Sequence, residues 1–120
     1  MADDADYCEA LVKDTDKDRF LATLFAPADS RADLYVLYAF DIETAAVAQR
    51  VRDPAAGEIR LQWWHDALAG ILESTGNPVA DAMLETTARN GIDTLLALSL
   101  IDARRQALYP NQHQSEAEFE

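Results

Sequence analysis

Asp14, Asp16 and Asp18 alternate along the chain like the first ligands of a calcium-binding loop. An EF-hand then requires a glycine at the sixth position and a bidentate glutamate at the twelfth. Those positions hold Arg19 and Phe25, so the sequence does not predict calcium binding. We expect these aspartates to cap the next helix and to place negative charge at its N-terminus.

The other side chains that often bind metals or act as nucleophiles are isolated. His65 and His113 are far apart, and no His, Cys and carboxylate spacing typical of a zinc site occurs. Cys8 is the only cysteine, so no intrachain disulfide can form, and no neighbouring base is placed to activate its thiol. We therefore predict no metal site.

Asp41 is the main candidate for a functional carboxylate, because it lies in a long segment that is apolar on several sides. Carboxylates in such surroundings are rarely left without a partner. Asp41 is expected either to pair with a base on a neighbouring helix or to belong to a polar site in a cavity. Both interpretations stay open at this point.

The elements that position these residues are predicted to be helices, because the chain is rich in Ala and Leu and has no alternating strand pattern. Breaks at proline and glycine separate six expected helices, at about 6–13, 16–25, 31–52, 58–72, 78–89 and 93–109. Asp29 and Ser30 are expected to cap the third helix, and residues 53–57 to interrupt the chain after it. The fold class is all-α, with residues 1–120 as a single helical domain.

The helix at 31–52 is apolar around more than half of its circumference, which is typical of the central helix of a bundle. In the next helix Leu61, Trp64, Leu68 and Ile71 form one apolar stripe, and Trp63 lies about 100° away from it. The residues predicted to be largely buried are Leu34, Leu37, Phe40, Leu61, Trp64, Leu68, Leu95 and Leu98.

Composition narrows the classes of function. The net charge of −12 disfavours binding to nucleic acid, whose backbone requires a cationic surface. The acidic N-terminus is not a signal peptide, and no apolar stretch is long enough to span a membrane, so the chain is expected to be cytoplasmic. Residues 115–118 fit a capping box, which indicates a further helix where the sequence stops.

Two sequence blocks carry a further signal, Leu34–Asp41 (LYVLYAFD) and Gly57–Leu68 (GEIRLQWWHDAL), together with Arg31. In this order they resemble the N-terminal half of the squalene/phytoene synthase family, whose all-helical members join two prenyl diphosphates. The resemblance implies that the chain forms the N-terminal part of an isoprenoid-synthase-like helical bundle and is truncated relative to the family's whole domain.

The resemblance also implies where a metal site should lie. Active members carry an Asp-x-x-x-Asp motif on this helix, because carboxylates four residues apart project from one face and can share magnesium and diphosphate. Here Ala45 and Gln49 occupy those positions, on the same stripe as Tyr38 and Asp41. The implied cavity face therefore has one carboxylate instead of two.

Arg104 and Arg105 lie near the end of the last predicted helix. Their spacing from Asp102 favours an ion pair at the surface or in a groove. The resemblance adds the alternative that they face a diphosphate.

Three hypotheses for function follow. The first is a non-catalytic family member without a cofactor, acting as an accessory or assembly factor; the chain is most similar to the branch that lacks the first aspartate-rich motif and includes a mitochondrial complex I assembly factor. The second is a magnesium-dependent head-to-head prenyl-diphosphate transferase of isoprenoid biosynthesis. The third is a small acidic helical interaction domain.

Five short helices are not expected to cover the long helix on every side. We predict an uncovered groove beside it, lined by some of Tyr38, Asp41, Ala45, Ala48 and Gln49. A protein partner or a second copy of the chain is the expected occupant. A prenyl lipid, or a peripheral contact with the inner membrane, also fits such a groove.

Overall fold

The computed structural model describes residues 3–50, 52–72 and 75–109. Over these ranges the chain forms six α-helices and no β-strand, which confirms the all-α fold class. The helices are α1 (Asp4–Thr15), α2 (Lys17–Thr23), α3 (Ala28–Arg50), α4 (Pro54–Leu68), α5 (Pro78–Asn90) and α6 (Thr94–Gln106). The capping box predicted at 115–118 lies outside the described residues.

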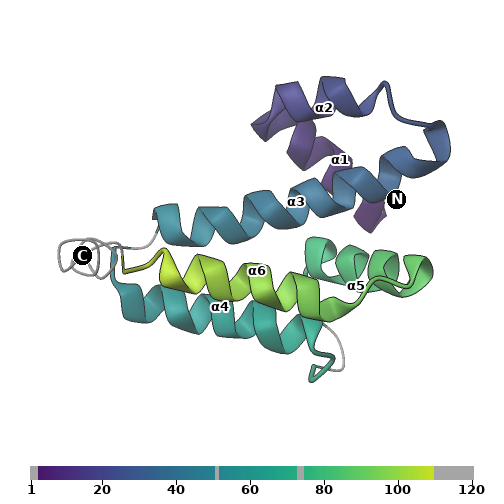
Figure 1. Ribbon diagram of the computed structural model, residues 1–120. Helices are drawn as coiled ribbons and strands as arrows, with labels where there is room; N and C mark the ends of the chain where they lie inside the picture. Colours follow the sequence, from purple (N-terminus) through teal and green to yellow (C-terminus); the bar gives the residue numbers. More distant parts are fainter. Residues whose placement is uncertain (1–2, 51, 73–74, 110–120) are drawn as a thin grey trace, which may run out of the picture.

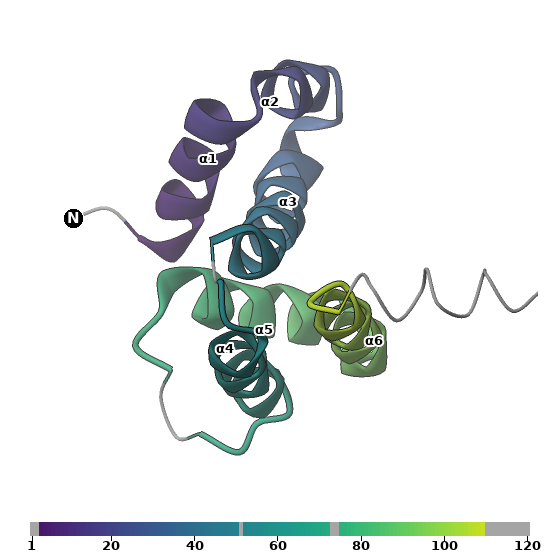
Figure 2. The ribbon, with the colours of Figure 1, turned by 90° about the vertical axis from the view of Figure 1, so that its left-hand side faces the viewer.

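Helix α3 is the centre of the bundle and packs against each of the other five helices. Figure 1 shows α1 and α2 on one side of α3 and the remaining three helices on the other, and Figure 2 shows the same two groups end-on. Helix α6 runs back alongside α4, while α5 packs against both α1 and α3. The central position predicted for the long helix is confirmed. None of the described helices is long and apolar enough to cross a bilayer.

Most of the helices have a polar N-cap residue whose side chain accepts a hydrogen bond from the first turn. The Asp16 carboxylate accepts a hydrogen bond of 3.1 Å from the backbone N–H of Arg19, which confirms that Asp16 caps the second helix. Asp53 caps α4 in the same way, and Pro54 occupies its first position. Helix α4 therefore begins within the segment 53–57, which was predicted to interrupt the chain. A proline at the first position of a helix is tolerated because the N–H group it lacks would have no helical partner.

Two other boundaries also differ from the prediction. Helix α3 begins at Ala28, so Asp29 and Ser30 lie inside its first turn and do not cap it. Helix α4 ends at Leu68, and Gly70 follows in the left-handed conformation with φ of 79°. Ile71 is therefore outside the helix and 67% exposed, and it does not continue the apolar stripe.

The core joins five of the six helices. Its largest fully buried side chains are Leu61, Ile101, Val12, Val79, Thr44 and Cys8. Four of the leucine and aromatic positions predicted to be buried are buried, namely Phe40, Leu61, Trp64 and Leu68.

The remaining predicted core positions differ. Leu34, Leu37 and Leu98 are half-buried, and Leu95 is 63% exposed. Ala97 and Ile101 are the buried residues of α6, and Leu95 points about 200° away from Ala97 because it precedes it by two residues. The prediction for Leu95 is wrong because only the packing of α6 selects which face turns inward.

Candidate functional site

The stripe predicted to line a cavity lies on the least covered side of α3. Tyr38, Asp41 and Ala45 are half-buried, and Gln49 is exposed. On the opposite side Val47 is only 8% exposed. The bundle therefore covers one side of α3 and leaves the side of the stripe partly open, without closing a cavity around it.

Asp41 sits between two guanidinium groups that come from two other helices. One carboxylate oxygen, Oδ2, accepts a hydrogen bond of 2.8 Å from Nη1 of Arg19 on α2. The other, Oδ1, accepts from Nη2 of Arg104 on α6. Asp41 therefore links α2, α3 and α6, and we call these three residues the Asp41 cluster. Its contacts correspond to the first interpretation of Asp41, pairing with bases on neighbouring helices.

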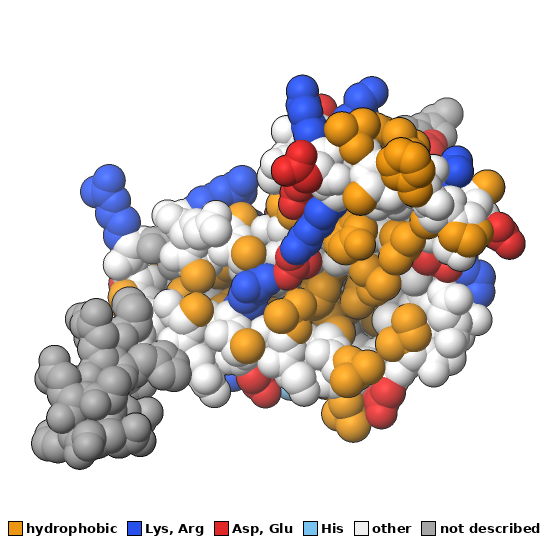
Figure 3. Space-filling view, turned by 45° about the horizontal axis from the view of Figure 1, so that its top comes forward, with side chains coloured by type: hydrophobic (Ala, Val, Ile, Leu, Met, Phe, Trp, Pro, Cys, Tyr) orange, Lys and Arg blue, Asp and Glu red, His pale blue; other side chains and the backbone are white. Residues whose placement is uncertain are grey.

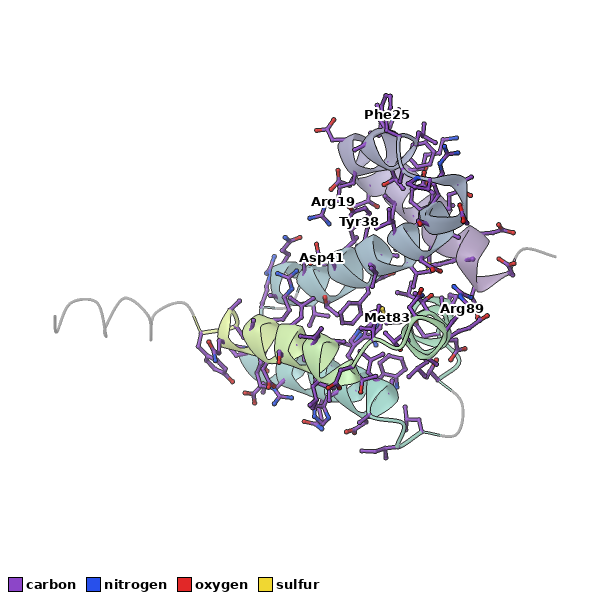
Figure 4. All side chains as sticks on the ribbon, turned by 45° about the vertical axis from the view of Figure 1, so that its right-hand side comes forward. Arg19, Phe25, Tyr38, Asp41, Met83 and Arg89 are labelled. Atoms are coloured by element: carbon purple, nitrogen blue, oxygen red, sulfur yellow. The ribbon has the colours of Figure 1, made fainter. Side chains whose placement is uncertain are left out.

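Arg19 is the member of the Asp41 cluster that sequence reasoning did not single out as a site residue. Figure 4 shows its side chain reaching from α2 toward Tyr38 and Asp41. Its guanidinium lies 4.9 Å from the centre of the Tyr38 ring, a distance typical of a cation–π contact. No local pattern in the sequence indicated this contact, because Arg19 and Asp41 are 22 residues apart and lie on different helices.

The carboxylates around Arg19 favour the charged form of its guanidinium. The hydrogen bond from Arg19 to Asp41 raises the pKa of the Arg19 guanidinium above its ordinary value, and the nearby charges of Asp41 and Asp16 act in the same direction. Asp16 adds a second carboxylate, with Oδ2 3.4 Å from Nε of Arg19. The two positive charges of Arg19 and Arg104 are thus balanced by the two negative charges of Asp16 and Asp41.

Arg104 and Arg105 are adjacent but reach different neighbours. Arg104 contacts Asp41, whereas Nη2 of Arg105 donates a hydrogen bond of 3.0 Å to Oε1 of Gln62 on α4. Asp102 lies 3.8 Å from Arg105 in the i, i+3 pair expected from the spacing. The two arginines therefore do not form a single cationic site.

The donor set of this face does not fit a magnesium–diphosphate site. Magnesium prefers several oxygen ligands, usually including more than one carboxylate in such sites. Ala45 has no ligand atom, Gln49 is a neutral exposed amide, and both oxygens of Asp41 already accept from guanidinium groups. A cation at Asp41 would have to displace two arginines that already neutralise it.

The uncovered surface only partly matches the predicted groove. Figure 3 shows hydrophobic side chains gathered on one face of the molecule, beside neighbouring basic and acidic side chains. The structure also has a groove of about 530 Å³, which α3 lines with Glu43, Ala46, Val47 and Arg50. None of the residues predicted to line a groove belongs to it. The four α3 residues that line this groove lie on the other side of the helix from Asp41, facing α4 and the segment 75–77.

The chain is similar to several proteins named NADH dehydrogenase (ubiquinone) complex I, assembly factor 6. It is 27% identical to the Homo sapiens protein over 116 residues, covering 95% of this chain and 35% of that protein. It is 28% identical to the Rattus norvegicus protein with the same coverage. The homologue from Drosophila melanogaster is 26% identical over 110 residues, covering 85% of this chain and 33% of that protein.

The chain thus spans about one third of the length of the curated relatives it matches. No solved structure matches it at a significant level. The family model described as squalene/phytoene synthase matches residues 12–120, almost the whole chain, in agreement with the two sequence blocks and the helical bundle. The chain belongs to the squalene/phytoene synthase family.

Proposed function

We propose that this chain belongs to a non-catalytic member of the squalene/phytoene synthase family that acts as an accessory or assembly factor for respiratory complex I. In this proposal it uses no metal cofactor, and the helical bundle serves as a scaffold for protein contacts. It would act in the cytoplasmic compartment, peripheral to the inner membrane. No nucleic acid is involved.

The Asp41 cluster is the observation that carries the proposal. Ionising an allylic diphosphate requires magnesium ions held by carboxylates, because the leaving group develops negative charge. Asp41, the carboxylate that α3 contributes to this stripe, is instead bound by Arg19 and Arg104. Removing one partner of a partly buried charge pair is unfavourable, so a metal would compete poorly for Asp41.

The similarity to complex I assembly factors supports the biological half of the proposal. Those relatives carry the assembly role in their names, and the similarity extends over 95% of this chain for the human and rat proteins. The half-open side of α3 supplies a surface on which a partner protein or a second copy could pack.

A gene disruption in the source organism tests the assembly role. We expect less assembled complex I on native gels and a matching loss of NADH:ubiquinone activity, with restoration by the wild-type gene. Normal complex I in the disrupted strain would contradict the role. The prenyl lipid content of the same strain is the internal control, because its loss with normal complex I would support a transferase.

A second experiment tests the absence of catalysis separately. The purified protein is incubated with labelled farnesyl or geranylgeranyl diphosphate and magnesium, and the products are separated by chromatography. We expect no condensation product. Magnesium-dependent turnover would refute the non-catalytic half of the proposal and leave the disruption result to decide the assembly half.

A further inference from the structure

The groove of about 530 Å³ is separate from the Asp41 cluster. It lies between the C-terminal half of α3, helix α4 and the segment 75–77 that leads into α5. Val47 and Arg50 line it from α3, at about 120° and 180° around the helix from Asp41. Its volume falls in the range of about 300–1,000 Å³ that is typical of small-molecule sites.

The apolar residues in the mixed lining of the groove are well packed. Trp64 is 4% exposed and Ala46 is 8% exposed. Trp63 is half-buried and packs edge-to-face on Trp64, with ring centroids 5.3 Å apart and an interplanar angle of 87°. Trp63, held in place by Trp64 beneath it, therefore offers the exposed aromatic surface that an apolar group can contact.

The rim of the groove carries two arginines, Arg50 and Arg60, and both are exposed. Neither forms an ion pair with any residue in the described part of the chain. By contrast, the arginines that contact acids are Arg19, Arg89, Arg104 and Arg105. Available guanidinium groups at a groove suit a carboxylate or phosphate, which they can bind with two hydrogen bonds each.

Among the described residues that line the groove, basic side chains outnumber acidic ones. Glu43 is the acid in its lining, against two arginines. Asp81, at the start of α5, accepts a hydrogen bond from the hydroxyl of Thr75. The described lining residues thus include two arginines and one glutamate, in a chain whose net charge is −12.

We propose that this groove binds a small amphipathic anion. Arg50 and Arg60 hold its carboxylate or phosphate head, and the aromatic surface of Trp63, held in place by Trp64, contacts its apolar body. The proposal does not depend on the complex I role, because it concerns the other side of α3 and a ligand taken up from solution as a monomer.

The tryptophans make this proposal directly testable. Trp63 and Trp64 are the only two tryptophans of the chain and both line the groove, so intrinsic fluorescence reports on this site. The 120-residue chain is titrated with octyl phosphate below its micelle concentration. Octyl glucoside, with the same chain and a neutral head, and inorganic phosphate alone are titrated in parallel.

We expect a saturable change in emission with octyl phosphate and at least tenfold weaker responses to both comparison compounds. The double variant Arg50→Gln/Arg60→Gln should bind octyl phosphate at least tenfold more weakly, because each guanidinium supplies charge-assisted hydrogen bonds. The variant Lys17→Gln also removes a positive charge, on exposed α2 surface, and should bind like the wild type.

Circular dichroism verifies that the variants are folded. Equal binding of octyl glucoside would show a nonspecific apolar surface, and equal binding of inorganic phosphate would show a bare anion site. Either result, or wild-type affinity in the folded double variant, overturns the proposal.

Discussion

Replacing Asp41 by alanine tests whether the Asp41 cluster holds α2 and α6 on α3. The change removes both hydrogen-bonded ion pairs and leaves Arg19 and Arg104 without their shared partner. The side chains of Asp41, Arg19 and Arg104 are 31%, 41% and 26% exposed, so solvent screens each pair in part. Surface pairs contribute about 0.2–1 kcal/mol and charged hydrogen bonds about 1.5–3 kcal/mol.

The partly exposed pairs should fall between these limits, at about 1 kcal/mol each. We therefore expect Asp41→Ala to lower the free energy of unfolding by about 2 kcal/mol, measured by urea denaturation. Asp14→Ala removes an exposed acid that contacts no base among the described residues, and it should change stability by less than about 0.5 kcal/mol.

A double-mutant cycle isolates the pair itself. Combining Asp41→Ala with Arg104→Gln should give a coupling energy of about 1 kcal/mol, reduced in high salt because the pair is partly exposed. A loss below about 0.5 kcal/mol for Asp41→Ala, or a more stable variant, would refute the assignment of a structural role to the Asp41 cluster. Stabilisation of the wild type by magnesium would show instead that Asp41 is available to a metal.

Three further measurements test other parts of the structure. The double substitution Ala45→Asp/Gln49→Asp should not create magnesium-dependent prenyl transfer in the labelled-substrate assay, because both carboxylate oxygens of Asp41 on the same face stay bound by arginines. Trp64→Ala should destabilise the fold by about 3–5 kcal/mol in urea denaturation, since its side chain is 4% exposed in the core, and an effect below about 1 kcal/mol would contradict that packing. Burial, with the nearby charges of Asp4 and Glu43, raises the pKa of the Cys8 thiol from 9.0 to about 11. Because the folded protein keeps this proton while the unfolded chain releases it, stability should fall as pH rises from about 9 to about 11 in the wild type and less steeply in Cys8→Ala, and identical pH profiles would contradict the assignment.

Much of the fold follows from local features of the sequence. The helical character of the chain, the central place of the 31–52 segment and the cap at Asp16 depend on propensity, periodicity and contacts over three residues. The stripe shared by Tyr38 and Asp41 also follows from the geometry of one helix. These properties are local, so no knowledge of the neighbouring helices is required.

The partners of Asp41 could not be obtained in this way. Arg19 and Arg104 are 22 and 63 residues away, and only the docking of α2 and α6 on α3 brings them to the same carboxylate. The sequence offers several arginines at comparable positions, and nothing local distinguishes the pair that meets Asp41.

The groove at Trp63 and Trp64 is likewise a result of tertiary packing. Its lining comes from α3, α4 and the segment 75–77, which are separate in sequence and meet only when α4 packs back on α3. The exposure of Leu95 has the same origin. Helical periodicity determines which residues of this protein share a face, but the tertiary structure decides which face meets a neighbour, because burial depends on the contacts made by the whole bundle.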